Sequence, residues 1–326
     1  MDGVAAVAGV RDEDRFLIGL VGSGIGTSLS PALHEREADE SGLRCLYRTL
    51  DLIVLGLPAA AVGDLLAAAR LTGYDGLNIT HPCKQVVLRH LDGLSPEAAA
   101  LRAVNTVVFT DGKAIGHNTD LAGFARNLRL GLPDAPLDQV VLLGAGGAGA
   151  AAAHALLEAG AGAVHVFDAD RHRGDVLVGS LRDRFGPDRA LAGRLDDDHV
   201  TLARVLHDAD GLVNATPVGM TAYPGLPLPA HLITSRLWVA DVVYRPLATE
   251  LLRTARARGC RVLDGGGMVV FQAAEAFRLF TGREPDADRM MRHFDALVLS
   301  AGGDRVGRRL PGSTGTGDVR PSAPAS

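Results

Sequence analysis

Short apolar runs alternate with longer amphipathic segments along most of the chain. Apolar runs of strand length lie at residues 16–22, 46–52, 76–79, 104–109, 114–117, 139–143, 163–167, 211–214 and 237–243. Apolar residues recur at helical spacing in other segments, among them residues 58–71, 86–91, 268–280 and 286–299. This alternation of strands and helices predicts an α/β fold with a largely parallel sheet. The turn at Asp111-Gly112 interrupts it and predicts a β-hairpin.

A glycine-rich segment follows the strand at 139–143 directly and opens an alanine-rich helix that runs to Glu158. Strand, glycine loop and helix in this order, with Asp168 closing the next strand, predict a dinucleotide site in a doubly wound sheet. The Asp168 carboxylate would bond the ribose hydroxyls and repel a 2′-phosphate, which favours NAD over NADP. Arg171 and Arg173 follow closely and weaken that preference, so NADP stays possible. The candidate cofactor-binding residues of this region are Gly144, Gly146, Gly147, Ala148, Gly149, Asp168 and Arg173.

Lysine is rare in this chain. There are two lysines among 33 basic residues, so arginine serves almost everywhere that a positive charge is needed. Arginine keeps its proton at any usable pH, whereas lysine can pass one on, and this makes Lys84 a candidate general acid or base. The other lysine, Lys113, lies in an ordinary turn, so rarity alone does not establish a role.

Polar residues gather around Lys84 in the sequence pattern. Only five asparagines occur, and three of them, Asn78, Asn105 and Asn118, fall in short polar stretches at strand ends. Each alone is typical of a turn or cap, but together with Lys84 and Asp120 they predict a hydrogen-bonding site.

A second polar pair, Ser28 and Ser30, lies in an extended segment before Pro31. Its two hydroxyls suit a carboxylate ligand. Alternatively, Ser30 merely caps the helix that Pro31 begins.

Composition limits the other possibilities. The chain has 326 residues, which suits two domains, and a net charge of −5 gives no electrostatic case for nucleic acid or an anionic membrane. No run is long enough for a membrane span and the N-terminus does not resemble a signal peptide, so we expect a cytoplasmic protein. The cysteines, Cys45, Cys83 and Cys260, have no metal-ligand or disulfide spacing and are expected to be free thiols.

Taken together, these motifs resemble the shikimate dehydrogenase family over about residues 16–296. The matching segments, in chain order, are Ser28 to Pro31, Asn78 to Lys84, Ala103 to Thr106, Gly116 to Asp120, Gly144 to Gly149, Asn214 to Met220, Asp241 to Pro246, and Gly267-Met268 with Gln272.

One departure bears on the cofactor. NADP-using members usually carry an Asn-Arg-Thr type sequence where this chain has Asp168-Ala169-Asp170. In this respect the chain is closest to the NAD-dependent quinate/shikimate dehydrogenases. Those enzymes can carry Thr where this chain has Ser30, which leaves the preferred ring acid open.

The resemblance implies an N-terminal α/β substrate domain at residues 16–119, a Rossmann-type NAD-binding domain at 120–266, C-terminal helices at 267–300 that return to the first domain, and a disordered tail at 301–326. It implies hydride transfer between a nicotinamide cofactor and shikimate or 3-dehydroshikimate, with Lys84 and Asp120 catalytic. The substrate carboxylate would be held by Ser28, Ser30 and Tyr244, and the ring hydroxyls by Asn78, Thr80, Asn105 and Gln272. Gly267 and Met268 would meet the nicotinamide, with Thr216 and Val243 along the cofactor.

Other readings of the same motifs stay open at this point. Quinate or an amino analogue of the ring acid would alter few contacts. A metabolite sensor that lost the chemistry would not need to keep both Lys84 and Asp120. Methylenetetrahydrofolate dehydrogenases share the two-domain plan, but the Ser-Leu-Ser-Pro and Asn-Thr-Asp segments disfavour them. The sequence fits a monomer and a homodimer equally.

Overall fold

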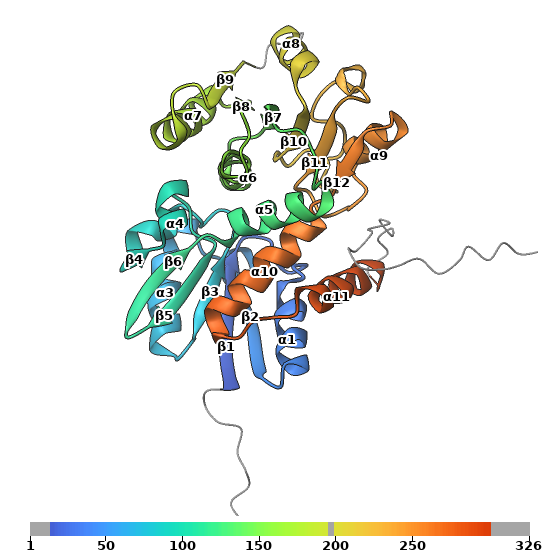
Figure 1. Cartoon of the computed structure of the whole chain (residues 1–326). Coiled ribbons are helices and arrows are strands. Elements are labelled where there is room, and N and C mark those ends of the chain that lie inside the picture. The colour runs from blue at the N-terminus through green and yellow to red at the C-terminus, as the bar shows by residue number, and fades with distance from the viewer. Residues whose placement is uncertain (1–13, 195–198, 301–326) are drawn as a thin grey trace, which may run out of the picture.

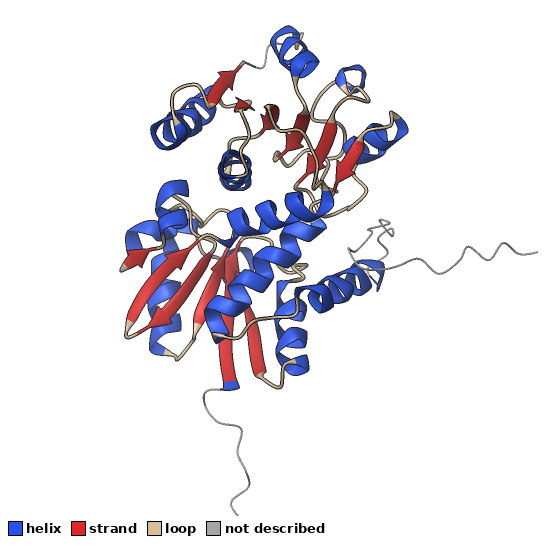
Figure 2. Ribbon diagram, viewed as in Figure 1, coloured by secondary structure: helices blue, strands red, loops and turns tan. Residues whose placement is uncertain are grey.

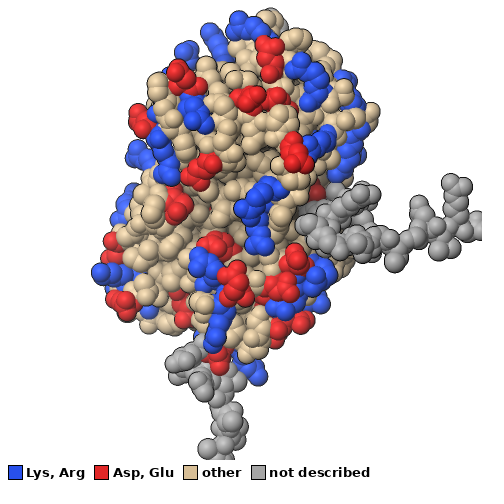
Figure 3. Space-filling model, in the orientation of Figure 1, with Lys and Arg blue, Asp and Glu red and all other residues tan. Residues whose placement is uncertain are grey.

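A computed structural model describes residues 14–194 and 199–300. The chain forms two lobes, each built on a six-stranded sheet (Figures 1 and 2). The disordered tail expected at residues 301–326 lies outside the described residues. Basic and acidic side chains are interspersed over the face seen in Figure 3. Within the described part of the chain, no helix is long and apolar enough to cross a membrane.

The first lobe contains a mixed sheet with strand order β2-β1-β3-β5-β6-β4. β1 pairs in parallel with β2 and β3, while β5 is antiparallel to both β3 and β6. Asp111 and Gly112 both have positive φ in the turn between β5 and β6, so the expected hairpin is confirmed. The elements of this lobe are β1 (Arg15–Gly22), α1 (Ser30–Glu40), β2 (Arg44–Asp51), α2 (Leu52–Leu55), α3 (Val62–Leu71), β3 (Gly76–Ile79), β4 (Gly93–Leu94), α4 (Pro96–Leu101), β5 (Thr106–Thr110) and β6 (Lys113–His117).

The second lobe contains a fully parallel sheet with strand order β12-β11-β10-β7-β8-β9. This is the doubly wound order of dinucleotide-binding folds, and its direction reverses between β7 and β10. The predicted α/β fold class is therefore confirmed. Its elements are β7 (Gln139–Leu143), α6 (Gly147–Glu158), β8 (Ala163–Phe167), α7 (Arg171–Phe185), β9 (Ala190–Gly193), α8 (Val200–Asp208), β10 (Gly211–Asn214), β11 (Trp238–Asp241), α9 (Glu250–Ala257) and β12 (Arg261–Leu263).

Two helices, α5 (Thr119–Gly131) and α10 (Gly266–Thr281), pack against each other where the lobes meet (Figure 1). Glycine permits the close approach. A Cβ built on Gly123 would lie 2.8 Å from the carbonyl oxygen of Met268, and one on Gly267 would lie 1.9 Å from Oδ1 of Asn127. Gly266 and Gly267 begin α10, and Gly267 lies in tight contact with α5, while a Cβ on Gly265 would meet the backbone of Val242 and Val243.

The sequence pattern also misplaced some helix starts. Residues 86–91, which the pattern predicts to be helical, form only a 3₁₀ helix, Val86–His90, after the turn that contains Pro82. The helix expected from residue 58 begins at Val62, after a 3₁₀ turn at Ala59–Ala61. Neither segment carries a side chain that caps its first turn, so sequence patterns placed these starts poorly.

The last helix, α11 (Ala287–Ser300), packs against α1 at the opposite end of the chain. Glu37 of α1 is fully buried and accepts hydrogen bonds from Nε and Nη2 of Arg289 at 2.9 and 2.6 Å. The backbone N–H of Asp286 adds a third, at 2.8 Å. This ion pair and the apolar side chains around it fix α11 on the first lobe.

Replacing Arg289 by methionine leaves Glu37 buried with no cation beside it. We expect Arg289→Met to lower the free energy of unfolding by about 2–3 kcal/mol, because an uncompensated buried charge is costly. Urea unfolding measures the change. In the matched control, Arg278→Met, the lost ion pair with Glu275 is largely exposed, and the change should stay within about 0.5 kcal/mol. Equal effects of the two variants would contradict the role given to Glu37.

Candidate active site

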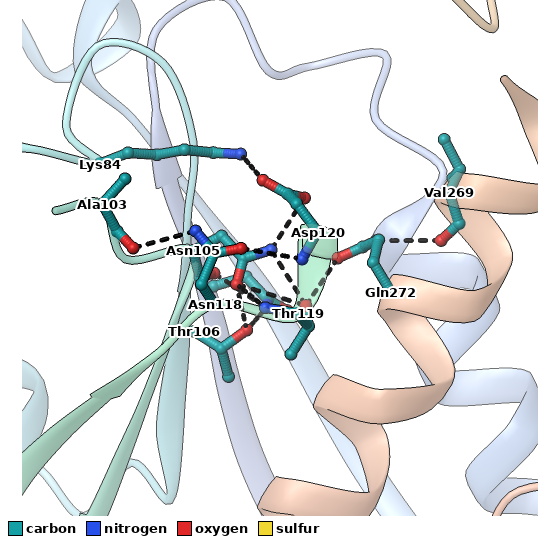
Figure 4. A network of polar contacts seen from close by, with 10 residues as sticks. Lys84, Ala103, Asn105, Thr106, Asn118, Thr119, Asp120, Val269 and Gln272 are labelled. Carbon is teal, nitrogen blue, oxygen red and sulfur yellow. Dashed lines mark hydrogen bonds and ion pairs between the residues drawn. The ribbon is translucent and has the colours of Figure 1, made fainter. Parts of the chain in front are cut away.

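The Lys84 ammonium group forms an ion pair with Asp120 (Figure 4). Lys84 lies in the turn after β3, and its carbonyl oxygen accepts a hydrogen bond from the N–H of Val104 at 2.9 Å. Asp120 belongs to the first turn of α5. The two side chains are 22% and 10% exposed, so the pair is largely shielded while Lys84 keeps access to a ligand.

Asn105 holds the Asp120 carboxylate from the other side. Its Nδ2 donates to Oδ1 of Asp120 and to Oγ1 of Thr119, both at 2.9 Å. Its Oδ1 accepts from the backbone N–H of Thr119 at 2.8 Å. The amide can satisfy these partners in only one orientation, so both the amide and the carboxylate are fixed before any ligand arrives.

Asn78 braces this arrangement from the neighbouring strand. Its Nδ2 donates to the carbonyl oxygen of Asn105 at 3.2 Å and to Oγ1 of Thr106 at 3.0 Å. Its Oδ1 accepts from the hydroxyl of Tyr47 at 2.6 Å. Burial raises the pKa of Tyr47 well above its ordinary value, so the hydroxyl remains a donor.

Tyr47 was not recognised in the sequence, because a lone tyrosine in a strand looks like an ordinary core residue. Its partner Asn78 lies two strands away in the sheet, and a polar residue at that position is the feature that could have indicated a role for Tyr47. Both side chains are 7% exposed. The polar chain therefore runs without interruption from Tyr47 through Asn78 and Asn105 to Asp120 and Lys84.

Asn118 and Gln272 complete the network from two helices. Asn118 caps α5, because its Oδ1 accepts from the N–H of Asp120 at 3.1 Å. Gln272, on α10, accepts from the Thr119 hydroxyl at 3.4 Å and donates to the carbonyl oxygen of Val269 at 3.0 Å. Gln272 is thus half-buried in the site rather than solvated on the surface of its helix.

Ser28 and Ser30 flank Leu29, and the apolar cluster that contains Leu29 is also contacted by Tyr244 of the second lobe. Ser30 is the first residue of α1, and no side chain caps that helix, so the capping role considered for Ser30 is wrong. Instead, Oγ of Ser28 accepts from the N–H of Ser30 at 3.2 Å. Tyr244 packs against the apolar cluster that contains Leu29, and the Arg245 side chain donates to the carbonyl oxygen of Thr27 at 2.5 Å.

Thr80 lies half-buried at the end of β3, beside the loop that follows β1. Its backbone N–H donates to the carbonyl oxygen of Val21 at 2.9 Å. A Cβ built on Gly22 would lie 2.3 Å from the Thr80 methyl group, so only glycine fits there. Thr80 is therefore held at the edge where the Ser28 loop begins.

The glycine loop has the shape expected of a phosphate-binding turn. Gly144 has φ of +97°, and a Cβ on Gly149 would lie 1.9 Å from its carbonyl oxygen. Gly146 precedes α6 and faces open space, which leaves the helix N-terminus accessible to an anion. A Cβ on Gly147 would lie 3.7 Å from Cδ of Lys84. The glycine loop and the lysine thus lie side by side, although they belong to different lobes.

The remaining candidates lie at the carboxyl ends of the parallel strands. Thr216 follows β10, and its hydroxyl donates to Oδ1 of Asn214 at 2.7 Å. Val243 follows β11 and is buried. Met268 lies in the first turn of α10 and is 7% exposed. Thr216 borders the point where the strand order reverses, which is where open α/β sheets bind ligands, and Val243 follows the neighbouring strand.

Comparisons with known proteins agree with this geometry. A model of the shikimate dehydrogenase substrate binding domain matches residues 20–107, and one of the shikimate 5′-dehydrogenase C-terminal domain matches residues 265–293. A shikimate dehydrogenase (NADP(+)) of Streptomyces avermitilis is 63% identical over 289 residues, which are 89% of this chain and 98% of that protein. The chain belongs to the shikimate dehydrogenase family. The resemblance inferred from the motifs is confirmed, and with it the assignment to an oxidoreductase class.

Shikimate dehydrogenase family members similar to this chain differ in the named cofactor. A quinate/shikimate dehydrogenase (NAD(+)) of Corynebacterium efficiens is 47% identical over 287 residues, covering 88% of this chain and all of that protein. The structure of quinate dehydrogenase from Corynebacterium glutamicum in complex with NAD has a TM-score of 0.81 at 44% identity, over 86% of this chain and 99% of that one. The family is thus NAD(P)-dependent, and these names leave the choice between the two dinucleotides open.

The region around Asp168 bears on that choice. Oδ2 of Asp168 accepts from the N–H of Ala145 at 2.6 Å, and Oδ1 accepts from the N–H of Asp170 at 2.7 Å. Arg173 pairs with Asp170 at 3.4 Å, and Asp170 also caps α7. A cavity of about 290 Å³ opens here, lined by Asp168, Ala169, Arg171, Asp175, Ala192, Gly193 and Arg194.

Tyr47→Phe tests the polar chain beneath the active site. The substitution keeps the ring but leaves Oδ1 of buried Asn78 without its donor, so we expect a loss of about 1–3 kcal/mol in the free energy of unfolding. Urea unfolding of Tyr47→Phe measures this loss. Tyr223→Phe, at an exposed tyrosine, is the control and should change little. Unchanged stability of Tyr47→Phe would mean that the hydroxyl does not support Asn78.

Proposed function

We propose that this protein catalyses reversible, NAD(P)-dependent oxidation of shikimate to 3-dehydroshikimate, with quinate as the alternative ring acid. The observation that carries the proposal is the Lys84–Asp120 pair, which lies beside the glycine loop of the parallel sheet. A proton-transfer group next to a dinucleotide site suits oxidation of an alcohol. The names of the similar proteins, shikimate and quinate dehydrogenases, support the choice of substrate.

Lys84 moves the proton. A bound nicotinamide dinucleotide would supply the hydride chemistry, and Nζ of Lys84 would take the hydroxyl proton of the ring in oxidation and return it in reduction. Asp120 accepts a hydrogen bond from a ring hydroxyl and keeps Nζ in place through its other oxygen. Because Asn105 fixes that carboxylate, the geometry needs no rearrangement when the substrate binds.

The remaining side chains would position the ring. Ser28, Ser30 and Tyr244 would hold its carboxylate; the proposal is supported by the packing of Tyr244 against the apolar cluster that contains Leu29, which lies between the two serines. Asn78, Thr80, Asn105 and Gln272 would bind the ring hydroxyls. Asn78 and Asn105 would also hold the site together, since the N–H groups of both amides have partners in the protein.

We assign residues 16–119 and 267–300 to the substrate-binding part and 120–266 to the dinucleotide-binding part. The glycine loop would bind the pyrophosphate at the N-terminus of α6. Thr216, Val243, Gly267 and Met268 would lie along the nicotinamide end.

We further propose a preference for NAD. Asp168 lines the cavity after β8. A carboxylate in this place would accept hydrogen bonds from the ribose hydroxyls and repel a 2′-phosphate. Arg173, the nearest match to a phosphate-binding arginine, is paired with Asp170 and so is partly neutralised.

Lys84→Ala tests the catalytic role. Turnover of shikimate should fall by about 10²–10⁴, because the developing charge on the substrate oxygen loses its proton partner. Initial rates of nicotinamide reduction measure the effect, with shikimate and quinate each offered NAD and NADP. Lys113→Ala removes the other lysine and should leave the rates unchanged. Near-normal turnover in Lys84→Ala would exclude the proposed role, and silence of the wild type with both acids would exclude the proposed function.

Asp168→Ser tests the cofactor preference. Without the carboxylate, the ratio of kcat/KM for NAD to that for NADP should fall by about tenfold or more, since repulsion of the 2′-phosphate is lost. Asp175→Ser removes another carboxylate of the same cavity, from the α7 surface, and serves as the control. A wild type that already prefers NADP would overturn the assignment.

A further inference from the structure

A buried carboxylate at the end of β11 has no part in the chemistry proposed above. Asp241 is 2% exposed, and no Lys or Arg pairs with it among the described residues. All of its hydrogen-bond donors are uncharged. Oδ1 accepts from Nδ2 of Asn214 and from the N–H of Val243, both at 3.0 Å, and Oδ2 accepts from the hydroxyl of Thr249 at 2.7 Å.

Asn214 links Asp241 to the loop after β10 through further hydrogen bonds. Its Oδ1 accepts from the N–H and the hydroxyl of Thr216, at 3.1 and 2.7 Å. Its Nδ2 donates to the carbonyl oxygen of Val218 at 3.0 Å as well as to Asp241. Every polar atom of this amide has a protein partner, so the Thr216 loop has one position relative to the end of β11.

Val243 connects the same carboxylate to the next segment. β10 and β11 are neighbouring parallel strands, with Asn214 paired in register with Asp241 (Figure 1). The loops that leave these two strands therefore start side by side, and Asp241 contacts both. Thr249 ties the carboxylate to the beginning of α9, where its hydroxyl also accepts from the N–H of Leu252 at 3.3 Å.

We propose that Asp241 is a positioning residue for dinucleotide binding, which through Asn214 and the Val243 N–H sets the two loops that face the nicotinamide half. This inference rests on the proposed function, because the roles of Thr216 and Val243 come from it. Asp241 touches neither cofactor nor substrate.

The charge of Asp241 is consistent with this role. Burial raises its pKa to about 6, with a smaller contribution in the same direction from Asp264, while the bonds from Thr249, Val243 and Asn214 oppose the rise. At neutral pH the carboxylate accepts on both oxygens. The loops, however, need only the acceptor at Oδ1, which an asparagine supplies equally, with one of its amide N–H groups directed to the Thr249 oxygen.

The test compares Asp241→Ala, Asp241→Asn and the control Leu251→Ala, which creates a cavity in α9 without touching the network. Binding of NAD and of NADP is measured by calorimetry, and KM and kcat by initial rates with shikimate. We expect Asp241→Ala to weaken binding of the preferred dinucleotide by at least about tenfold while kcat changes by less than about threefold. Asp241→Asn should restore binding to within about threefold.

Asn214→Ala extends the test and replaces Asp241→Ala if that variant does not fold. It should also weaken dinucleotide binding, and the double variant should lose less than the sum of the two single losses, because the two residues share a hydrogen bond. The positioning role would be overturned if Leu251→Ala weakened binding as much as Asp241→Ala does. Additive effects of Asp241→Ala and Asn214→Ala would also overturn it. A wild type that neither binds a dinucleotide nor oxidises shikimate would instead overturn the proposed function.

Discussion

The close contact of α5 with α10 is the constraint on which the site depends. Gly123 and Gly267 allow the two helices to approach until backbone and side chain touch. Asp120 is in the first turn of one helix, and Met268 and Gln272 are in the first turns of the other. A side chain at either glycine would separate the helices, and the network around Lys84 would lose its contact with Gln272 of α10.

The polar network below the site shows why its parts are hard to assign one at a time. Asn78, Asn105 and Thr119 each use their donors and acceptors on one another, so the group is rigid as a unit. Asn78, which we propose as a substrate ligand, also uses its two N–H groups within the protein. Rigidity of this kind lets Lys84 and Asp120 face a ligand in a prepared geometry.

Sequence patterns predicted the parallel sheet well because its strands are buried on both faces, and Gln139–Leu143 and Gly211–Asn214 match to the residue. The glycine loop was predictable for a different reason, because its backbone geometry demands glycine at positions such as Gly144 and Gly149. The helix α5 was not singled out, although Asn118 caps it. Tyr47 and the Asp241–Asn214 pair were missed because their partners are distant in sequence, and only the folded sheets bring them together.

The packing of α11 on α1 has a consequence for the order of folding. The apolar cluster that contains Leu33 of α1 is completed by Met290 and Phe294, near the end of the chain. The parallel sheet of the second lobe, in contrast, is drawn from one continuous stretch. During synthesis the second lobe therefore has all its strands before the first lobe has its full core. The lobe that emerges first from the ribosome is the one that finishes last, and until α11 arrives its buried Glu37 has no partner on that helix.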